Sequence, residues 1–259
     1  MSTSGSPFPA DAYDAEYFLT SCDGYDAFRA SGGRVLGRRM AVALELAGPL
    51  AGRRVLDLGC GRGEVFRHCS DLGARAVGLD FSPDALSLAR EALGEAPTGA
   101  LLRGDATQLP LADGSPDVVL ALDLVEHLSP PQLARLYAEV HRVLAPGGRL
   151  VVHTMPNIWY YRAGYPLFRL VQRLRGVRLP RNPRDRWAAG ALHVNEQSVL
   201  SLWRMLRVAG FRVTVYLRDA QDYTREPNPW VRRGMTLLAR MQPFACVFCN
   251  DLFAVATKP

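Results

Sequence analysis

The chain has 259 residues, of which 48% are hydrophobic and 22% charged, a composition ordinary for a folded protein with a substantial core. No run of about 18 apolar residues occurs, which excludes a membrane-spanning helix, and five scattered cysteines exclude a dense disulfide framework. The net charge of +6 is concentrated in residues 156–195, which carry eight arginines and one acid, so the rest of the chain is near neutral and nucleic acid is not expected as a partner.

Hydrophobic periodicity predicts the elements in chain order. Helices are expected over 11–19 and 37–46, separated by a turn-rich aromatic stretch at 22–28. Strands and helices then alternate: strands at 55–58, 76–79, 100–103, 117–122 and 149–153, and helices at 64–72, 83–93 and 130–144. After about forty irregular residues, a helix capped at Asn195 and a strand at 211–217 follow. A stretch at 226–243 that is interrupted by prolines then precedes the last strand, at 251–257. The alternation predicts an α/β fold with a parallel sheet and right-handed crossovers.

One turn in this pattern indicates a ligand site. Residues 55–63 read Val-Leu-Asp-Leu-Gly-Cys-Gly-Arg-Gly, an apolar strand that breaks into glycines before a helix. Glycines at such a turn let the backbone approach a ligand closely. The dinucleotide fingerprint would need glycine at position 64, where the chain has Glu64, and the acid Asp57 would repel a pyrophosphate. A cationic ligand without phosphate therefore fits better.

With this acid and its Gly-x-Gly-x-Gly turn, the chain resembles the class I S-adenosylmethionine-dependent methyltransferases. The resemblance extends over residues 52–152 and includes Asp80-Phe81 after the second strand, Gly104-Asp105-Ala106 after the third, a Val125-Glu126-His127 version of a Leu-Glu-His signature, and a Pro-Gly-Gly turn at 146–148. It implies a Rossmann-like, seven-stranded, mostly parallel sheet with an antiparallel last strand. It also implies S-adenosylmethionine as cofactor, S-adenosylhomocysteine as product and no metal.

The resemblance assigns individual cofactor contacts. Asp80 is expected to accept the ribose hydroxyls, Phe81 to flank the adenine, and Asp105 to face the adenine amino group. The competing interpretation of both acids is a helix cap or a turn residue. The full expected set is Asp57, Gly59, Cys60, Gly61, Gly63, Asp80, Phe81, Asp105, Ala106 and Leu122.

Three histidines are candidates for a catalytic base, which a hydroxyl acceptor would require. His127 follows the fourth strand, His153 ends the fifth, and His193 lies where the irregular segment returns to the sheet. Each of them also fits a capping or packing role. His68 and His141 lie inside predicted helices and are expected to be structural, as is the Cys246-x-x-Cys249 pair, because residues three apart in a strand point to opposite faces.

We expect one methyltransferase domain over 1–259: a helical segment at 1–50, a cofactor-binding core at 51–155, a substrate cap at 156–195 and the rest of the sheet at 196–259. The cap combines arginines with aromatic residues such as Trp159 and Trp187. It is interpreted as a solvated helix, as a pocket for an anionic acceptor, or as a helix on an anionic membrane surface carrying a lipid-linked acceptor.

These patterns predict methyl transfer, with oxygen as the accepting atom, to a small-molecule, glycan or lipid-linked acceptor. Two alternatives are a non-catalytic cofactor-binding scaffold and a cyclase that uses the cofactor without methyl transfer. The amino-terminal residues contain no basic cluster and no apolar run, so no signal peptide is expected and the predicted location is the cytoplasm. A monomer or homodimer is expected.

Overall fold

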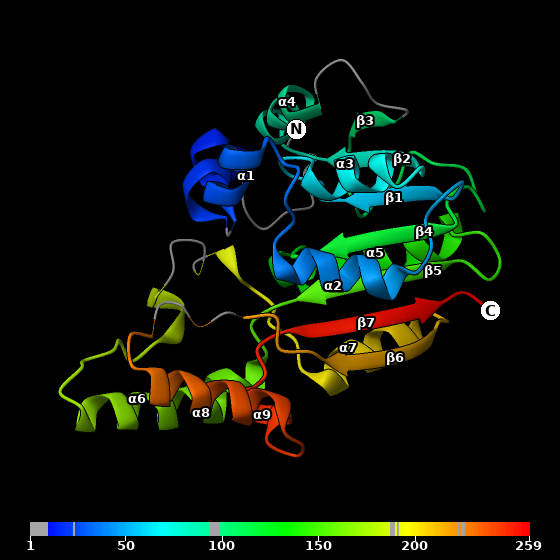
Figure 1. The fold of residues 1–259 in the computed structure, drawn as a ribbon. Coiled ribbons are helices and arrows are strands. Elements are labelled where there is room, and N and C mark those ends of the chain that lie inside the picture. The colour runs from blue at the N-terminus through cyan, green and yellow to red at the C-terminus, as the bar shows by residue number, and fades with distance from the viewer. Residues whose placement is uncertain are drawn as a thin grey trace.

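The computed structural model describes residues 10–22, 24–93, 99–186, 190, 192–221, 223 and 226–259, and within them the sheet has seven strands. The strand order is β3-β2-β1-β4-β5-β7-β6 (Figure 1). Neighbouring strands from β3 to β5 are parallel, and β7 runs antiparallel to both β5 and β6. The predicted Rossmann-like fold with its antiparallel last strand is confirmed. Trp187 lies outside the described residues.

The predicted strands are present with small shifts at their ends. They are β1 (Arg54–Leu58), β2 (Arg75–Asp80), β3 (Ala100–Arg103), β4 (Val118–Leu122), β5 (Arg149–Thr154), β6 (Arg212–Leu217) and β7 (Leu252–Thr257). The helices are α1 (Tyr25–Ser31), α2 (Arg38–Ala47), α3 (Glu64–Asp71), α4 (Pro83–Leu93), α5 (Pro130–Val143), α6 (Tyr165–Leu174), α7 (Val199–Val208), α8 (Pro229–Arg240) and α9 (Ala245–Phe248). Short helical turns are η1 (Ala10–Tyr13), η2 (Tyr17–Ser21), η3 (Val125–His127), η4 (Tyr160–Gly164) and η5 (Pro183–Arg186).

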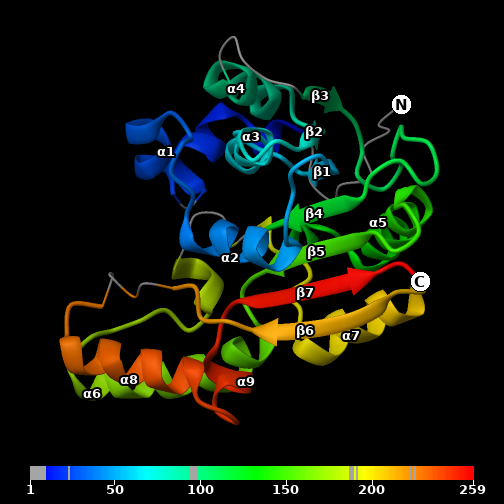
Figure 2. The same cartoon turned by 45° about the vertical axis from the view of Figure 1, so that its right-hand side comes forward.

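Both faces of the sheet are covered by helices, which explains its apolar strands. Every residue of β4 is buried, as expected for a central parallel strand. Helices α2 and α3 pack on one face and α5 and α7 on the other (Figure 2). This arrangement leaves the carboxyl ends of the parallel strands facing the amino-terminal segment and the helices beyond β5.

Helices α6, α8 and α9 lie together beside the sheet, at the lower left of both ribbon views (Figures 1 and 2). The sequence indicated a helix near α6 but treated 226–243 as interrupted by prolines. Here the prolines begin and follow a helix instead of breaking it. Pro229 is the first residue of α8, and the side chain of Asn228 caps it by accepting from the backbone N–H groups of Trp230 and Val231.

Three local expectations are corrected. The stretch 22–28 is not all turn, because α1 begins at Tyr25 between two left-handed glycines, Gly24 and Gly32. The predicted helix over 11–19 is replaced by the short turns η1 and η2. Helix α7 is capped by Ser198 and not by Asn195. The Asn195 side chain instead donates to the carbonyl of Leu128 at 3.0 Å.

The Cys246–Cys249 pair lies at the end of a helix and not in a strand, so the reason given for expecting a structural role was wrong. Cys246 is within α9, and its thiol contacts Gln242 Oε1 at 3.6 Å. Cys249 is the residue after α9 and is fully buried. Both cysteines are free thiols.

Candidate functional site

A cavity of about 1210 Å³ lies at the carboxyl ends of β1, β2 and β4 and extends between α6 and α8. Nine of the ten predicted cofactor residues border it; the tenth, Gly63, does not. Two of the three candidate histidines, His127 and His193, also border it. The parallel topology explains this convergence, because residues that follow neighbouring parallel strands meet at one edge of the sheet.

The glycine turn is held against the neighbouring strand. The backbone N–H groups of Gly59 and Cys60 donate to the carbonyl of Leu79 at 2.8 and 3.2 Å. Gly59 and Gly61 have φ angles of +67° and +50°, a conformation that side chains disfavour. A Cβ on Gly59 would also lie 3.2 Å from Leu124. The turn therefore presents bare backbone to the cavity.

Asp80 is oriented by the turn that it supports. One carboxylate oxygen accepts from the Gly61 N–H and the other from the Ser82 N–H, both at 2.9 Å. Burial raises the pKa of Asp80, while these N–H groups act in the opposite direction. The carboxylate is only 4% exposed, yet borders the cavity. Its remaining lone pairs can accept hydrogen bonds from a bound ligand.

Asp57 has an unsatisfied oxygen. The residue is 3% exposed, and its Oδ2 has no hydrogen-bond partner among the described residues. Burial, together with the nearby acids Asp80 and Glu64, raises the pKa of Asp57 to about 8. A buried polar atom without a partner is costly. An ammonium group of a ligand would supply both the missing hydrogen bond and a compensating charge, so this position fits S-adenosylmethionine.

The other predicted cofactor residues also border the cavity. Asp105 Oδ1 accepts from the backbone N–H and the hydroxyl of Thr107, at 2.7 and 2.8 Å. The ring of Phe81 packs edge-on against Tyr13, with centroids 5.2 Å apart. Ala106 and Leu122 border the same space.

Gly63 has a packing role. It precedes α3 with a φ of +82°, and a Cβ there would lie 2.9 Å from the Cβ of Ala89 on α4. The third glycine of the turn therefore lets α3 approach α4 closely. It does not border the cavity.

Gly63→Ala should lower the free energy of unfolding by about 2–3 kcal/mol, because the left-handed backbone and the overlap with Ala89 each add strain. Urea unfolding followed by circular dichroism measures this loss. Gly234→Ala is the matched control: Gly234 is inside α8, and a Cβ there meets nothing within 4 Å. That variant should be unchanged or more stable by up to about 1 kcal/mol. Equal stability of the two variants would contradict the packing role.

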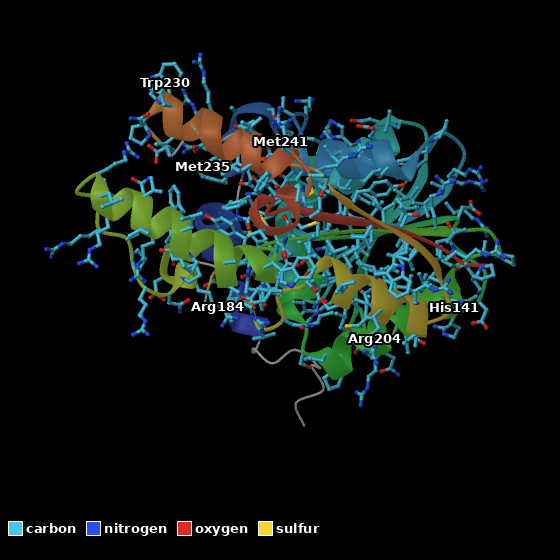
Figure 3. All side chains as sticks on the ribbon, turned by 90° about the horizontal axis from the view of Figure 1, so that it is seen from below. His141, Arg184, Arg204, Trp230, Met235 and Met241 are labelled. Atoms are coloured by element: carbon cyan, nitrogen blue, oxygen red, sulfur yellow. The ribbon has the colours of Figure 1, made fainter. Side chains whose placement is uncertain are left out.

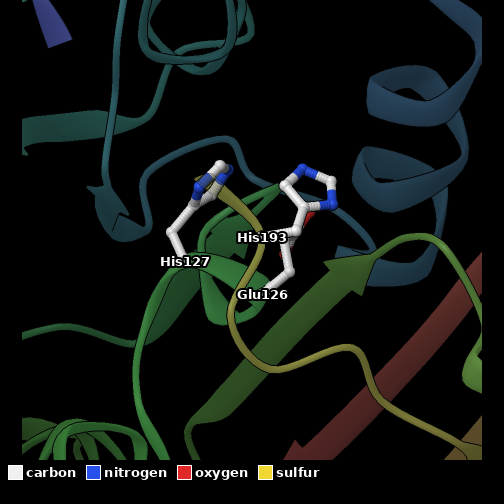
Figure 4. A group of neighbouring side chains, drawn as sticks. All are labelled: Glu126, His127 and His193. Carbon is white, nitrogen blue, oxygen red and sulfur yellow. The ribbon is translucent and has the colours of Figure 1, made fainter. Parts of the chain in front are cut away.

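His127 and His193 lie next to each other in the wall of the cavity, with Glu126 beside them (Figure 4). Their rings are perpendicular, with centroids 4.9 Å apart. His127 Nδ1 is 3.2 Å from both the Tyr13 hydroxyl and the Leu192 carbonyl oxygen. Burial lowers the pKa of His127 to about 3 and that of His193 to about 4. Both imidazoles are therefore neutral near pH 7.

Glu126, His127 and His193 also have the chemistry of metal ligands. One ligand atom of each lies within 4.8 Å of the others. Two of these groups already have partners: His127 Nδ1 as described, and Glu126 Oε2, which accepts from the Thr154 hydroxyl at 2.9 Å. The expected absence of a metal stays a prediction.

His153 is placed away from the cavity. It is fully buried, with Nδ1 2.5 Å from Asp123 Oδ1 and Nε2 3.3 Å from Asp251 Oδ1. Burial alone would lower its pKa, but the two carboxylates outweigh it and raise the pKa to about 9. A protonated imidazole held between two acids is suited to structural charge pairing and not to accepting a proton from a substrate.

The sequence did not reveal that the amino-terminal segment forms one wall of the site. Tyr13, Tyr17 and Phe18 border the cavity. Arg62, in the glycine turn, is 5% exposed and donates to the Phe18 carbonyl at 2.9 Å. It also pairs with Glu64 at 2.9 Å. The aromatic residues at 13–18 were the available signal, but nothing local to them indicates that they reach residues a hundred positions away.

Comparisons with known proteins agree with this geometry. Residues 56–152 match the family model described as a methyltransferase domain. A probable S-adenosylmethionine-dependent methyltransferase of Mycolicibacterium smegmatis is 32% identical over 68% of this chain and 58% of its own. A demethylmenaquinone methyltransferase of Clavibacter sepedonicus is 33% identical over 63% of this chain and 67% of its own. The chain belongs to the class I S-adenosylmethionine-dependent methyltransferases.

The fold of this methyltransferase is also found in solved structures. A putative methyltransferase of Haloferax volcanii, solved in complex with the Trm112 methyltransferase activator, aligns with a TM-score of 0.65 over 95% of this chain and 97% of its own, at 21% identity. The methyltransferase spans little more than half the length of the first curated relatives that it matches, 51% and 58%. Among its described residues, no helix is both long and apolar enough to cross a membrane.

Proposed function

We propose that this methyltransferase transfers a methyl group from S-adenosylmethionine to a small molecule that has an apolar part. The observation that carries the proposal is the continuity of the cavity. It joins the turn at Gly59 and the carboxylate of Asp80 to an apolar slot between α6 and α8. A cofactor and an acceptor can therefore lie in one continuous space.

The cofactor end has residues suited to the ammonium, the ribose and the adenine of S-adenosylmethionine. We assign the ammonium to Asp57, the ribose hydroxyls to Asp80 and the adenine to the region of Phe81 and Asp105. The exposed backbone of Gly59 and Gly61 allows close approach. When bound, the cofactor supplies an electrophilic methyl on a sulfonium, whose leaving group is a neutral thioether.

The acceptor end is mainly apolar. Leu167 and Val171 of α6 face Val231, Met235 and Leu238 of α8 across it. Two cavity arginines here already have partners: Arg175 pairs with Glu226 at 3.2 Å, and Arg186 lies over the rings of Tyr165 and Phe168. This lining favours a lipid-linked or prenylated acceptor over an anionic one. Demethylmenaquinone, named in several relatives, has this character.

His127 is the residue that we assign as the base for a hydroxyl acceptor. The Leu192 carbonyl can only accept, so Nδ1 of the neutral ring carries the proton and Nε2 keeps the lone pair. A pKa of about 3 leaves Nε2 unprotonated across the physiological range but makes it a weak base. It can still accept the hydroxyl proton, because that proton becomes strongly acidic as the oxygen gains the methyl group. We propose oxygen as the accepting atom. His153, already protonated, has no part in this step.

Titration calorimetry with S-adenosylhomocysteine tests the cofactor assignment, and incubation with methyl-labelled S-adenosylmethionine tests transfer. We expect label to move into the organic phase when a short-chain demethylmenaquinone is added after chemical reduction to its quinol, the form that carries hydroxyl groups. Chemical analysis of that product identifies the methylated atom. Binding of S-adenosylhomocysteine without any transfer would favour the scaffold alternative. Consumption of cofactor with no labelled acceptor would favour the cyclase alternative.

His127→Ala should lower the rate of label transfer by about 100-fold or more, since general-base catalysis contributes at least that much. The dissociation constant for S-adenosylhomocysteine should stay within about threefold, because the assigned base acts on the acceptor. His68→Ala on α3, at a half-buried surface position, is the control and should keep full activity. A rate unaffected by His127→Ala would remove this residue from the mechanism.

A further inference from the structure

Helix α8 has two separate faces, and only one of them lines the cavity. Val231, Gly234, Met235 and Leu238 border the cavity at helical spacing. Trp230, Arg233 and Leu237 do not, and they form a neighbouring face with Met241 and Phe244 beyond the helix. The exposed fractions of the apolar members are high, at 74% for Trp230, 58% for Leu237, 43% for Met241 and 44% for Phe244. Soluble surfaces rarely keep so many large apolar side chains together.

Helix α6 repeats this division. Leu167 and Val171 border the cavity and are 50% and 39% exposed, whereas Leu170 and Leu174 do not border it and are 53% and 81% exposed. Helices α6 and α8 lie next to each other in the ribbon views and from below (Figures 1 and 3). The slot between them is part of the cavity. Exposed apolar side chains therefore flank the route from the surface to the apolar end of the site.

The charged residues of these two segments are all positive. Residues 160–180 contain five arginines and no acid, and residues 227–250 contain three arginines and no acid. Within the part of the chain that the structure describes, two of the eight have acidic partners from outside these segments: Arg175 with Glu226 and Arg240 with Asp219. Arg233 lies over the ring of Trp230 at 5.1 Å from its centroid. Arginine beside tryptophan and leucine is the composition of helices that lie in the headgroup region of anionic bilayers.

We propose that the outer faces of α6 and α8 dock this methyltransferase on an anionic membrane surface, so that the apolar part of a lipid acceptor enters the cavity through the slot between the two helices. The inference builds on the proposed function by naming the medium from which its acceptor comes. The apolar side chains enter the interface, and the arginines contact lipid phosphates.

Vesicle flotation of the full chain tests the docking, with phosphatidylcholine vesicles and with vesicles in which about a third of the lipid is phosphatidylglycerol. We expect binding to the anionic vesicles, and its loss at about 0.5 M salt, where charge attraction is screened. The variant Trp230→Ala/Arg233→Glu/Leu237→Asp should lower the partition coefficient at least about 30-fold. None of its three positions borders the cavity.

Helix α7 supplies the matched control. It carries Leu200 and Trp203, 64% and 45% exposed, and Arg204, which is far from Trp230 (Figure 3). Leu200→Asp/Trp203→Ala/Arg204→Glu makes the same chemical changes there and should bind vesicles like the unmodified chain. S-adenosylhomocysteine titration is run on all proteins and reports both folding and the cofactor site.

The outcomes separate the two proposals. Absence of vesicle binding by the unmodified chain, or an equal loss in the α7 variant, overturns the docking while S-adenosylhomocysteine binding leaves the proposed function standing. Vesicle binding without S-adenosylhomocysteine binding overturns the proposed function and leaves the docking standing. The unmodified chain could instead fail to bind vesicles and self-associate in sedimentation equilibrium, while the α8 variant stays monomeric. That result would assign this face to a second copy and also overturn the membrane proposal.

Discussion

Asp80→Ala should weaken the binding of S-adenosylhomocysteine by about 100-fold or more in titration calorimetry. Each hydrogen bond from a ribose hydroxyl to a buried carboxylate contributes about 1.5–3 kcal/mol, and both would be lost. The loss extends further, because the Asp80 carboxylate also accepts from the backbone of Gly61 and so positions the glycine turn.

Two controls separate these effects. Asp71→Ala removes an equal charge from an exposed position on α3 and should change the dissociation constant by less than about twofold. Asp80→Asn keeps a carbonyl oxygen for the turn but presents an amide to the ribose. Its affinity for S-adenosylhomocysteine should therefore lie between that of the unmodified chain and that of Asp80→Ala. An unchanged dissociation constant for Asp80→Ala, with the fold intact by circular dichroism, would contradict the assignment of Asp80 to the ribose.

His153→Gln should lower the free energy of unfolding by about 3 kcal/mol at pH 6.5. Glutamine can still hydrogen-bond, but it removes the positive charge between Asp123 and Asp251 and leaves buried carboxylates less compensated. The folded pKa of about 9 is above the unfolded value of about 6.5. Protonation of His153 therefore stabilises the fold fully below pH 6.5, and this contribution is lost as pH rises through 9.

Urea unfolding at pH 6.5 and pH 9.5 measures this dependence. The unmodified chain should lose roughly 3 kcal/mol more than His153→Gln between these two values. The difference between the two proteins isolates His153, because other groups that titrate in this range, such as Asp57, are common to both. Parallel curves for the two proteins would show that the imidazole between Asp123 and Asp251 is neutral in the fold.

The sheet, and the gathering of most of the expected cofactor residues at one cavity, could be predicted from the sequence because their signals are local. An apolar strand such as 118–122 must be buried on both faces, and the glycines after β1 have a spacing that only certain turns need. The register of Asp80 and Asp105 followed from their places at strand ends. Topology then brought them together without any knowledge of side-chain contacts.

The remaining features depend on contacts distant in sequence. His153 and His127 looked alike as histidines near strand ends, but Asp251 pairs with the first from nearly a hundred positions away. Tyr13 reaches His127 across 114 positions. Helix α8 was missed for a different reason: its prolines lie just inside its start and just after its end, where they favour a helix, and the pattern was interpreted as if they interrupted one.

The two faces of α8 give this methyltransferase two properties that can be changed separately. Substitutions at Val231, Met235 or Leu238 reshape the slot that would hold the acceptor's tail, and they leave Trp230 and Leu237 untouched. A preference for the length of the acceptor's tail can thus be selected in a library confined to three positions, while the proposed membrane-docking face stays unchanged. On these proposals, one helix of twelve residues would determine both acceptor specificity and membrane binding.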